Sequence, residues 1–325
     1  MITVGIDLGC SEIKAIVLDR TGQVLATIRT PTSGSTADDG PSWLTTVRRL
    51  VNDLRQTVSN KNVLVGIAAP GLAAKDGLSI FNMPVRMEGV EGLIWSSVFE
   101  SLLPVPVLND AHAALLAEAV LGAAREKKHV VMLTLGTGVG GAILIDGELY
   151  QGAIGRAGHI GHMTLRSDFS RDIVGTPGSL EDLFGDHTVS ARSHGRFATN
   201  QELVRAHEKG DGHATRIWMD SVRQLACGIA SITNILDPEL IVLGGGITKA
   251  GTTLFDPLKS FLHDVEWRPN GHEVEIVPAL LGTWAGAIGA GYRAFPVDIQ
   301  AELKRRNLCA AFVNSPGFAM SVEPG

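Results

Sequence analysis

The sequence predicts an α/β protein built as two layered lobes, and three observations lead to this prediction. β-rich runs alternate with amphipathic helical runs along most of the chain, which is typical of sheets covered by helices. The succession of strand, glycine turn and strand occurs near the N-terminus and again after residue 130. A length of 325 residues also exceeds what one hydrophobic core usually supports, so two domains or one two-lobed unit are expected.

The first half opens as a meander of three short strands, at residues 2–7, 13–18 and 24–30, with turn residues between them. The elements expected after the meander are a helix from 41 to about 58, a strand at 63–69, a helix near 91–102, a strand at 105–108 and an alanine-rich helix at 111–124.

The second half starts a new sheet at 130–135. The elements expected after it are a helix at 221–236, a strand at 240–243, a helix opened by Gly244-Gly245-Gly246 and a small-residue-rich helix at 284–294 that can pack on the first lobe. We place the boundary near residue 112. The predicted domains are a small lobe of residues 1–112 plus about 284–310, a large lobe of residues 113–283, and a loose tail of residues 311–325.

Composition excludes several classes of protein. The net charge is −6, with 28 Lys and Arg spread against 34 Asp and Glu, so no basic stripe offers itself to nucleic acid. The cysteines Cys10, Cys227 and Cys309 are far apart and odd in number, which favours neither a disulfide framework nor a cysteine-rich metal site. The sequence shows no basic leader and no apolar run of membrane-spanning length. We therefore expect a cytoplasmic protein without a membrane or nucleic-acid partner.

Glycine turns carry the first functional signal. The segment from Gly136 to Gly141 lies between two apolar runs, and Thr137 adds a hydroxyl donor to backbone N–H groups that can converge on an anion. On spacing alone, an ordinary tight hairpin explains this turn equally well. Asp7 and Gly9 follow the first strand in the same way, and two such turns can clamp a triphosphate. The sequence contains no P-loop, so turns and Mg²⁺ must handle the phosphates.

Two further groups have alternative interpretations. Asp110 follows a strand and starts a helix, which makes it a natural N-cap, but a carboxylate between two nucleotide-binding lobes can also accept a hydroxyl proton. His159 and His162 are three residues apart, and suit either a polyol or a metal. Because no cysteine or second paired motif lies nearby, we favour the polyol.

In their order and spacing, these motifs resemble the ROK family of bacterial sugar kinases (repressor, open reading frame, kinase) over roughly residues 1 to 295. The matching segments are Gly5-Ile6-Asp7-Leu8-Gly9, Pro70-Gly71, Asn109-Asp110-Ala111, Gly136-Thr137-Gly138-Val139-Gly140-Gly141, Gly158-His159-Ile160-Gly161-His162, Ser179-Leu180-Glu181, Leu236-Asp237-Pro238, Leu243-Gly244-Gly245-Gly246 and the small-residue run from Ala285 to Ala290. The resemblance implies a two-lobed actin-like ATPase fold, related to ribonuclease H, with the active site in a cleft between the lobes. It also implies a homodimer.

The resemblance implies that Asp110 is the general base that deprotonates the C6 hydroxyl of a hexose for attack on ATP. The implied sugar contacts are Asn82 (in the loop 82–89), Asn109, His159, His162 and Glu181. Asp7 would hold Mg²⁺ through water. The implied nucleotide contacts are Gly9, Ser11, Glu12, Gly136, Thr137, Gly138, Gly244, Gly245 and Gly246.

The chain departs from the family pattern at three places. Aligning back from Glu181 puts Asp172, Val174 and Ser179 where most members carry three zinc-binding cysteines, so we predict no zinc and a loop at 163–178 held by packing and hydrogen bonds. His159 replaces a glutamate that touches the sugar in relatives, which should alter substrate preference.

The third departure is at residues 10–12, where Cys10, Ser11 and Glu12 replace the usual Gly, Thr and Lys. Ser11 keeps the hydroxyl. The negative charge of Glu12 is expected to weaken phosphate affinity, because a second acidic group at this position repels ATP.

The leading hypothesis is therefore an ATP-dependent hexokinase acting on glucose, with N-acetylhexosamines or fructose as alternative substrates. A sugar-responsive repressor would need a helix-turn-helix before Asp7, for which the sequence leaves no room. A catalytically silent sugar-binding regulator is the alternative of another class, and retention of Asp7, Asp110 and the glycine turn argues against it. No cationic track favours polyphosphate as donor.

Overall fold

The computed structural model describes residues 1–32, 41–57, 63–83 and 87–305, and the chain forms two compact units. Unit 1 comprises Met1–Arg125, Gln151–Arg156 and the segment from Thr283 onward, and unit 2 comprises Glu126–Tyr150 and Ala157–Gly282. Both units are α/β, which confirms the predicted fold class. Cys309 and the predicted tail lie outside the described residues.

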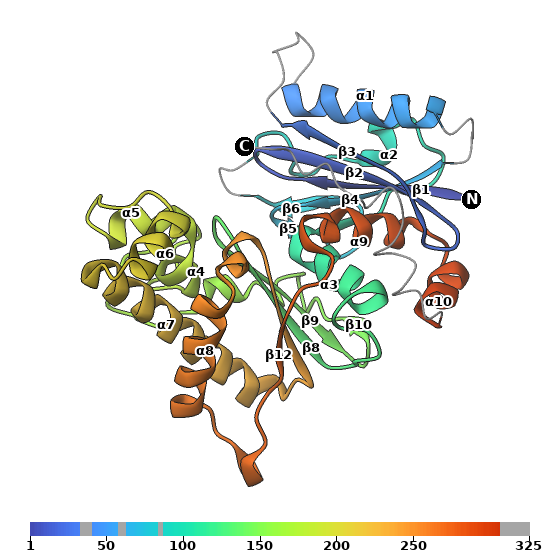
Figure 1. The fold of residues 1–325 in the computed structure, drawn as a ribbon. Coiled ribbons are helices and arrows are strands. Elements are labelled where there is room, and N and C mark those ends of the chain that lie inside the picture. Colours follow the sequence, from blue (N-terminus) through green and yellow to red (C-terminus); the bar gives the residue numbers. More distant parts are fainter. Residues whose placement is uncertain (33–40, 58–62, 84–86, 306–325) are drawn as a thin grey trace. The chain divides into compact units, whose positions relative to one another are not determined.

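Unit 1 is built on a five-stranded sheet with the order β3-β2-β1-β4-β7 (Figure 1). Its strands are β1 (Ile2–Leu8), β2 (Glu12–Asp19), β3 (Val24–Pro31), β4 (Val63–Ala69) and β7 (Val107–Asn109). The first three strands form the predicted antiparallel meander, whereas β4 runs parallel to β1 and β7 parallel to β4. A separate hairpin of β5 (Leu72–Ala73) and β6 (Ile80–Asn82) follows β4.

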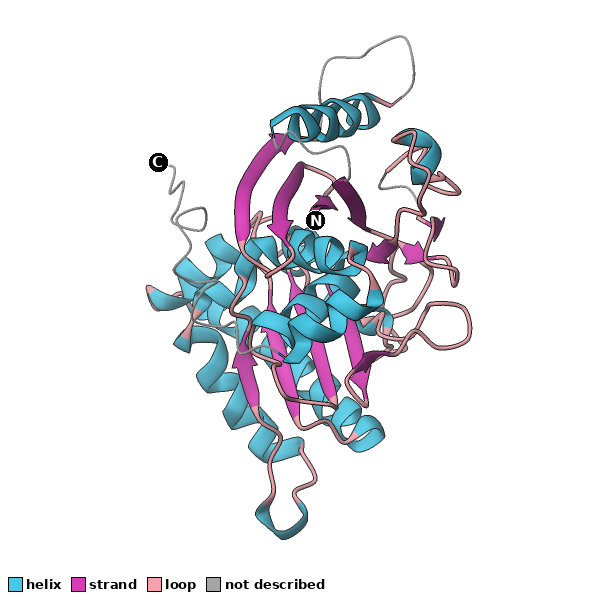
Figure 2. Cartoon of the chain, turned by 90° about the vertical axis from the view of Figure 1, so that its right-hand side faces the viewer, coloured by secondary structure: helices cyan, strands magenta, loops and turns pink. Residues whose placement is uncertain are grey.

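Helices cover both faces of this sheet. On one face, α1 (Ser42–Thr57) packs over a core that includes Val4 and Ile6 of β1 (Figures 1 and 2). Successive side chains of a strand point to opposite faces, so Gly5 faces the other way, toward α9 (Ala285–Ala294). A Cβ atom at Gly5 would lie 1.9 Å from the Ala287 carbonyl oxygen. This close approach explains the small-residue composition of α9, which also packs on α3 (Asp110–Leu121).

Unit 2 contains a second five-stranded sheet, in the order β10-β9-β8-β11-β12. Its strands are β8 (Val130–Leu135), β9 (Val139–Ile145), β10 (Glu148–Leu149), β11 (Leu240–Gly244) and β12 (Ile276–Pro278). The helices that share its core are α4 (Leu180–Phe184), α6 (Asn200–Glu208), α7 (Gly212–Leu236) and α8 (Thr252–Val265). Trp218 of α7 is fully buried in this core.

The remaining elements are short. They are α2 (Trp95–Val98), α5 (Val189–Arg192), α10 (Val297–Arg305) and the 3₁₀ helices η1 (Ile160–His162), η2 (Asp186–Thr188), η3 (Gly246–Ala250), η4 (Pro269–Gly271) and η5 (Gly282–Trp284). In the part of the chain that the structure describes, no helix is both long enough and apolar enough to span a bilayer.

Four sequence-based helices were wrong in extent. The helix expected at 221–236 begins earlier, because α7 starts at Gly212 with Asp211 as its N-cap. The helix expected near 91–102 is only the four residues of α2, because Gly92 and Glu100 adopt positive φ on either side of it. The helix expected at 111–124 ends at Leu121, where the Glu118 carboxylate accepts the Ala123 N–H at 2.7 Å. The helix expected at Gly244–Gly246 begins as η3, and regular α-helix starts only at Thr252.

The predicted domain boundary near residue 112 would cut α3. The structure places α3 whole within unit 1.

Candidate functional site

In unit 1, Asp7 lies near the end of β1 and points to the face covered by α9. A Cβ at Gly286, in the first turn of α9, would lie 2.9 Å from the Asp7 carboxyl carbon, so a glycine is needed to leave room for this carboxylate. Lys14 Nζ lies 3.6 Å from Asp7 Oδ2. Burial raises the pKa of Asp7 to about 6; Lys14 opposes this shift, and the negative charges of Asp110 and Glu12 add to it. Such a carboxylate is suited to accept a cation.

The charge of Glu12 is compensated within unit 1. Glu12 Oε2 lies 3.6 Å from Lys14 Nζ and 3.8 Å from the guanidinium of Arg29. Arg29 also donates a hydrogen bond to Thr283 Oγ1 at 2.7 Å and lies 4.6 Å above the centre of the Trp284 ring. Lys14 and Arg29 therefore offset the negative charge of Glu12, which was expected to repel ATP. The sequence-based expectation did not include these two cations.

The turn between β1 and β2 is held by backbone contacts. Gly9 N–H donates to the Glu12 carbonyl at 3.1 Å, and the Thr32 hydroxyl donates to the Gly9 carbonyl at 2.6 Å. Thr32 N–H also donates to the Ser11 carbonyl at 3.1 Å, while Ser11 itself is exposed. These three hydrogen bonds hold the turn together, and the exposed residue Ser11 lies at its surface.

At the start of α3, both Asn109 and Asp110 accept backbone N–H groups, and the Asp110 carboxylate accepts the Ala111 N–H at 2.8 Å. Asn109, not Asp110, is the N-cap: its side-chain oxygen accepts the N–H groups of Ala111 at 3.0 Å and His112 at 3.2 Å. Its amide nitrogen donates to the Gly71 carbonyl at 2.9 Å. Asp110 is the first helical residue and is exposed. The expectation that Asp110 caps the helix was wrong by one residue.

Asn82 is the last residue of β6 and is exposed. Residues 84–86, which follow it closely in the sequence, lie outside the described ranges. The Asn82 carbonyl oxygen lies 2.7 Å from where a Cβ at Gly71 would be. Asn82 and Asn109 therefore both flank Gly71, which has φ +99° and joins β4 to β5. The structure thus brings these two predicted sugar contacts to one place in unit 1.

In unit 2, the glycine turn is shorter than the predicted segment from Gly136 to Gly141, because Val139 to Gly141 belong to β9. Gly136 N–H donates within the turn to the Gly138 carbonyl at 3.0 Å. Within the described ranges, neither the Thr137 N–H nor the Gly138 N–H donates a hydrogen bond, and Thr137 is exposed. The donors that this turn offers to an anion are therefore two successive N–H groups and the Thr137 hydroxyl.

Glu181 lies directly behind this turn. Its Oε2 accepts the Val139 N–H at 3.0 Å, and a Cβ at Gly138 would lie 2.1 Å from the same oxygen. Glu181 is buried, at the first turn of α4, and Ser179 caps that helix by accepting the Asp182 N–H at 3.3 Å. The residue predicted to bind sugar therefore also shapes the glycine turn.

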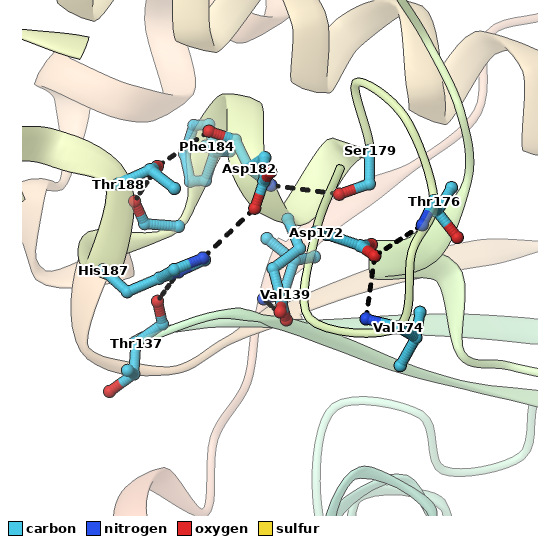
Figure 3. A network of polar contacts seen from close by, with 12 residues as sticks. Thr137, Val139, Asp172, Val174, Thr176, Ser179, Asp182, Phe184, His187 and Thr188 are labelled. Atoms are coloured by element: carbon cyan, nitrogen blue, oxygen red, sulfur yellow. Dashed lines mark hydrogen bonds and ion pairs between the residues drawn. The ribbon is translucent and has the colours of Figure 1, made fainter. Parts of the chain in front are cut away.

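His187 also holds the turn, through hydrogen bonds that the sequence analysis did not predict. The Thr137 carbonyl accepts hydrogen bonds from His187 N–H at 3.0 Å and from its Nδ1 at 2.7 Å. The other ring nitrogen lies 3.2 Å from Asp182 Oδ1 (Figure 3). No spacing rule links residues 50 positions apart, so only the fold reveals this contact.

The His159 and His162 pair lies at η1, against β9. A Cβ at Gly161 would lie 1.8 Å from the Val139 carbonyl, which explains why this motif requires glycine. His159 precedes η1, and His162 ends it. His162 Nδ1 lies 2.8 Å from Asp172 Oδ2, and this contact was also missed from the sequence.

The three glycines after β11 have different surroundings. A Cβ at Gly244 would meet the Met132 side chain at 2.8 Å, and one at Gly245, where φ is +91°, would meet the Leu135 carbonyl at 2.2 Å. A Cβ at Gly246 would meet nothing within 4 Å. Backbone contact thus accounts for Gly245, whereas Gly244 meets the flexible end of a side chain and Gly246 borders open space.

The residues at the family's zinc-ligand positions do not fit zinc. Val174 has no donor atom, and the direct contact between His162 Nδ1 and Asp172 leaves no room for an ion between them. Within the described ranges, no three His, Cys, Asp or Glu side chains are grouped so as to hold a metal. Asp7, by contrast, supplies the oxygen ligand that Mg²⁺ prefers, and Mg²⁺ usually keeps several waters.

Comparisons with known proteins agree with this geometry. Over 90% of the chain, the structure superposes with a TM-score of 0.74 on 99% of a ROK family glucokinase from Streptomyces griseus in complex with glucose and AMPPNP, at 26% identity. This match confirms the two-lobed actin-like ATPase class.

The ROK family model matches residues 3–294, so the chain belongs to the ROK family, and it is a sugar kinase. A glucokinase from Halalkalibacterium halodurans is 29% identical over 320 residues, covering 89% of this chain and 93% of that protein. The bifunctional enzyme NanE/NanK from Brucella melitensis is 36% identical over 224 residues, covering 62% of this chain and 40% of that protein.

Proposed function

We propose that this sugar kinase transfers the γ-phosphoryl group of ATP to the C6 hydroxyl of a hexose, with glucose as the preferred substrate and Asp110 as general base. The observation that carries the proposal is the position of Asp110 directly after the N-cap of α3. Asn109 is the N-cap, and the Asp110 carboxylate, which accepts the Ala111 N–H at 2.8 Å, is exposed at the first helical residue, where it can accept the hydroxyl proton.

The proposal assigns sugar binding to Asn82, Asn109, His159, His162 and Glu181. In unit 1, Asn82 and Asn109 lie beside Gly71. In unit 2, His159 and His162 flank η1, and Glu181 lies buried against β9. Side chains that donate and accept hydrogen bonds at fixed positions are suited to the hydroxyls of a hexose.

The nucleotide part of the proposal assigns the phosphates to two turns. The turn in unit 1 contributes Gly9, Ser11 and Glu12, and the turn in unit 2 contributes Gly136, Thr137 and Gly138. Gly244 and Gly245 shape the end of β11, and Gly246 borders the open space that a nucleoside could occupy. Mg²⁺, held by Asp7 through water, would neutralise charge on the phosphates.

Glucose is favoured because the structural match bound to glucose and the glucokinase relative both span about nine-tenths of this chain. N-acetylmannosamine is the second candidate, because a protein from Listeria monocytogenes described as a putative N-acetylmannosamine kinase superposes on 90% of this chain with a TM-score of 0.74 at 26% identity. His159, which stands where the family resemblance implies a glutamate, supports a changed preference, since imidazole can donate as well as accept.

The test is a coupled ADP-release assay with Mg²⁺·ATP across glucose, fructose, allose, N-acetylglucosamine and N-acetylmannosamine. We expect the highest kcat/KM with glucose, and NMR of the product should place the phosphate on C6. A higher value with N-acetylmannosamine would transfer the assignment to that sugar. Binding of sugar without any ADP release would instead support a silent regulatory protein. The same proposal includes a homodimer, which sedimentation velocity would detect.

A further inference from the structure

In the loop between η1 and α4, several groups contact one carboxylate, that of Asp172. Asp172 Oδ1 accepts the N–H groups of Val174 at 3.0 Å and Thr176 at 2.8 Å, and Oδ2 lies 2.8 Å from His162 Nδ1. The side chain of Asp172 has no exposed surface. Figure 3 shows this carboxylate inside the loop, pointing at the backbone of Val174 and Thr176.

We propose that the Asp172 carboxylate replaces a metal ion as the organiser of this loop and positions His162 as a hydrogen-bond acceptor for the substrate. The first half of the proposal is independent of the enzyme's substrate. The second half rests on the proposed function, because it assigns His162 to the sugar.

The arrangement inverts the charges of a metal centre. A zinc ion is a cation surrounded by lone pairs, whereas Asp172 is an anion surrounded by donors. Burial alone would raise the pKa of Asp172, but hydrogen bonds from His162, Thr176 and Ser179 outweigh it and hold the pKa below its usual value. The carboxylate therefore stays ionised and accepts from several directions at once.

The carboxylate also closes the loop on itself. Asp172 N–H donates to the Thr176 carbonyl at 2.9 Å, and the Asp172 carbonyl accepts the Gly175 N–H at 2.9 Å. The two ends of the loop are paired in turn, since Leu165 N–H donates to the Gly178 carbonyl at 2.9 Å. Asp172 thus does for this segment what a bound ion does for a metal-stabilised loop.

The contact with His162 determines how that ring can meet a ligand. A carboxylate only accepts, so Nδ1 must carry the hydrogen, and in the neutral ring Nε2 is then an acceptor. About 30% of the His162 side chain is exposed, in contrast to Asp172. His162 is therefore partly accessible to a ligand, and Nε2 is the ring nitrogen that can accept a hydrogen bond from a sugar hydroxyl.

The first test is Asp172→Asn, with Asp168→Asn as the matched control, because Asp168 is an exposed acid of the same loop. The asparagine oxygen can still accept the N–H groups of Val174 and Thr176. Its amide group would donate to His162 Nδ1 and move the ring hydrogen to Nε2. We expect ¹⁵N NMR to show this tautomer change, and KM for the sugar to rise about tenfold while kcat and KM for ATP stay within about twofold.

The outcomes separate the two halves of the proposal. If His162 kept its hydrogen on Nδ1 in Asp172→Asn, the positioning role would be refuted. If the tautomer changed but KM for the sugar did not, the assignment of His162 to the substrate would be refuted and the loop role would stand. The Asp168→Asn control should match the parent in both measurements.

The second test needs no activity. After dialysis against EDTA, the parent protein should hold less than ~0.1 zinc per chain with an unchanged Tm. A triple variant with Asp172→Cys, Val174→Cys and Ser179→Cys should bind about one zinc together with His162 and lose stability when EDTA is added. About one zinc per parent chain, or a triple variant that binds none, would overturn the proposal.

Discussion

Gly136→Ala tests whether the glycine at this position is needed for phosphate binding rather than for packing. A Cβ at Gly136 would meet nothing within 4 Å, and the φ angle of this residue is not in the left-handed region. The methyl group would therefore enter open space next to Thr137. If that space holds phosphate, the methyl group will exclude it.

The two effects have opposite signs. Replacing glycine by alanine where the backbone tolerates it stabilises a protein by about 0.4–1 kcal/mol, because the unfolded chain loses freedom. An extra methyl in a filled site costs roughly 1–3 kcal/mol. That cost corresponds to a rise in KM for ATP of roughly 5- to 150-fold. We therefore expect a variant that is slightly more stable and binds ATP much more weakly.

The assays are urea unfolding and steady-state kinetics with ATP varied at saturating sugar. Gly212→Ala is the matched control at the first residue of α7, since, apart from the adjacent residues and the local helix backbone, the nearest atom to a Cβ there would be an Arg216 side-chain nitrogen at 3.9 Å. It should be at least as stable as the parent with an unchanged KM. An unchanged KM for ATP in Gly136→Ala would refute the phosphate role of this turn, and a large loss of stability would refute the open space.

Three further predictions follow from the same structure. Gly5→Ala should lose more than about 3 kcal/mol of unfolding free energy in urea, because its Cβ would overlap the Ala287 carbonyl, and parental stability would contradict the packing of α9. The pKa of Asp7 is raised to about 6, so the folded state holds this proton more tightly than the unfolded chain and stability is lost as pH rises from about 4 to 6. Asp7→Asn should therefore gain roughly 1–3 kcal/mol relative to the parent between pH 4 and pH 7, and a gap independent of pH would refute this. His187→Ala removes a hydrogen bond worth about 1 kcal/mol from the Thr137 carbonyl, so KM for ATP should rise without a change in KM for the sugar, whereas an equal rise in both would contradict a local brace.

Periodic features of the fold were predictable from the sequence because they repeat along the chain. The meander, the buried strand at residues 63–69 and the small-residue helix all follow from local alternation or composition, and the structure confirms them. The failure at residues 91–102 has a physical reason. Trp95, Val98 and Phe99 are spaced like one helical face and are buried in the same core, but two positive φ angles confine the helix to one turn.

The site was harder to predict, because its supporting contacts are not local. The cations around Glu12 could have been found, since the register of the meander places Asp7 opposite Lys14 and Lys14 opposite Arg29. The contacts of His162 with Asp172 and of His187 with Thr137 depend on how loops close over β9. No local pattern encodes those distances.

The most direct test of the central claim is Asp110→Asn, assayed for both catalysis and binding. If Asp110 is the general base, sugar-dependent ADP release should fall by about 10²- to 10⁴-fold. Calorimetric titration with the sugar should give a Kd close to the parental value, because the amide preserves the size and shape of the side chain. Turnover comparable to the parent would contradict the assignment.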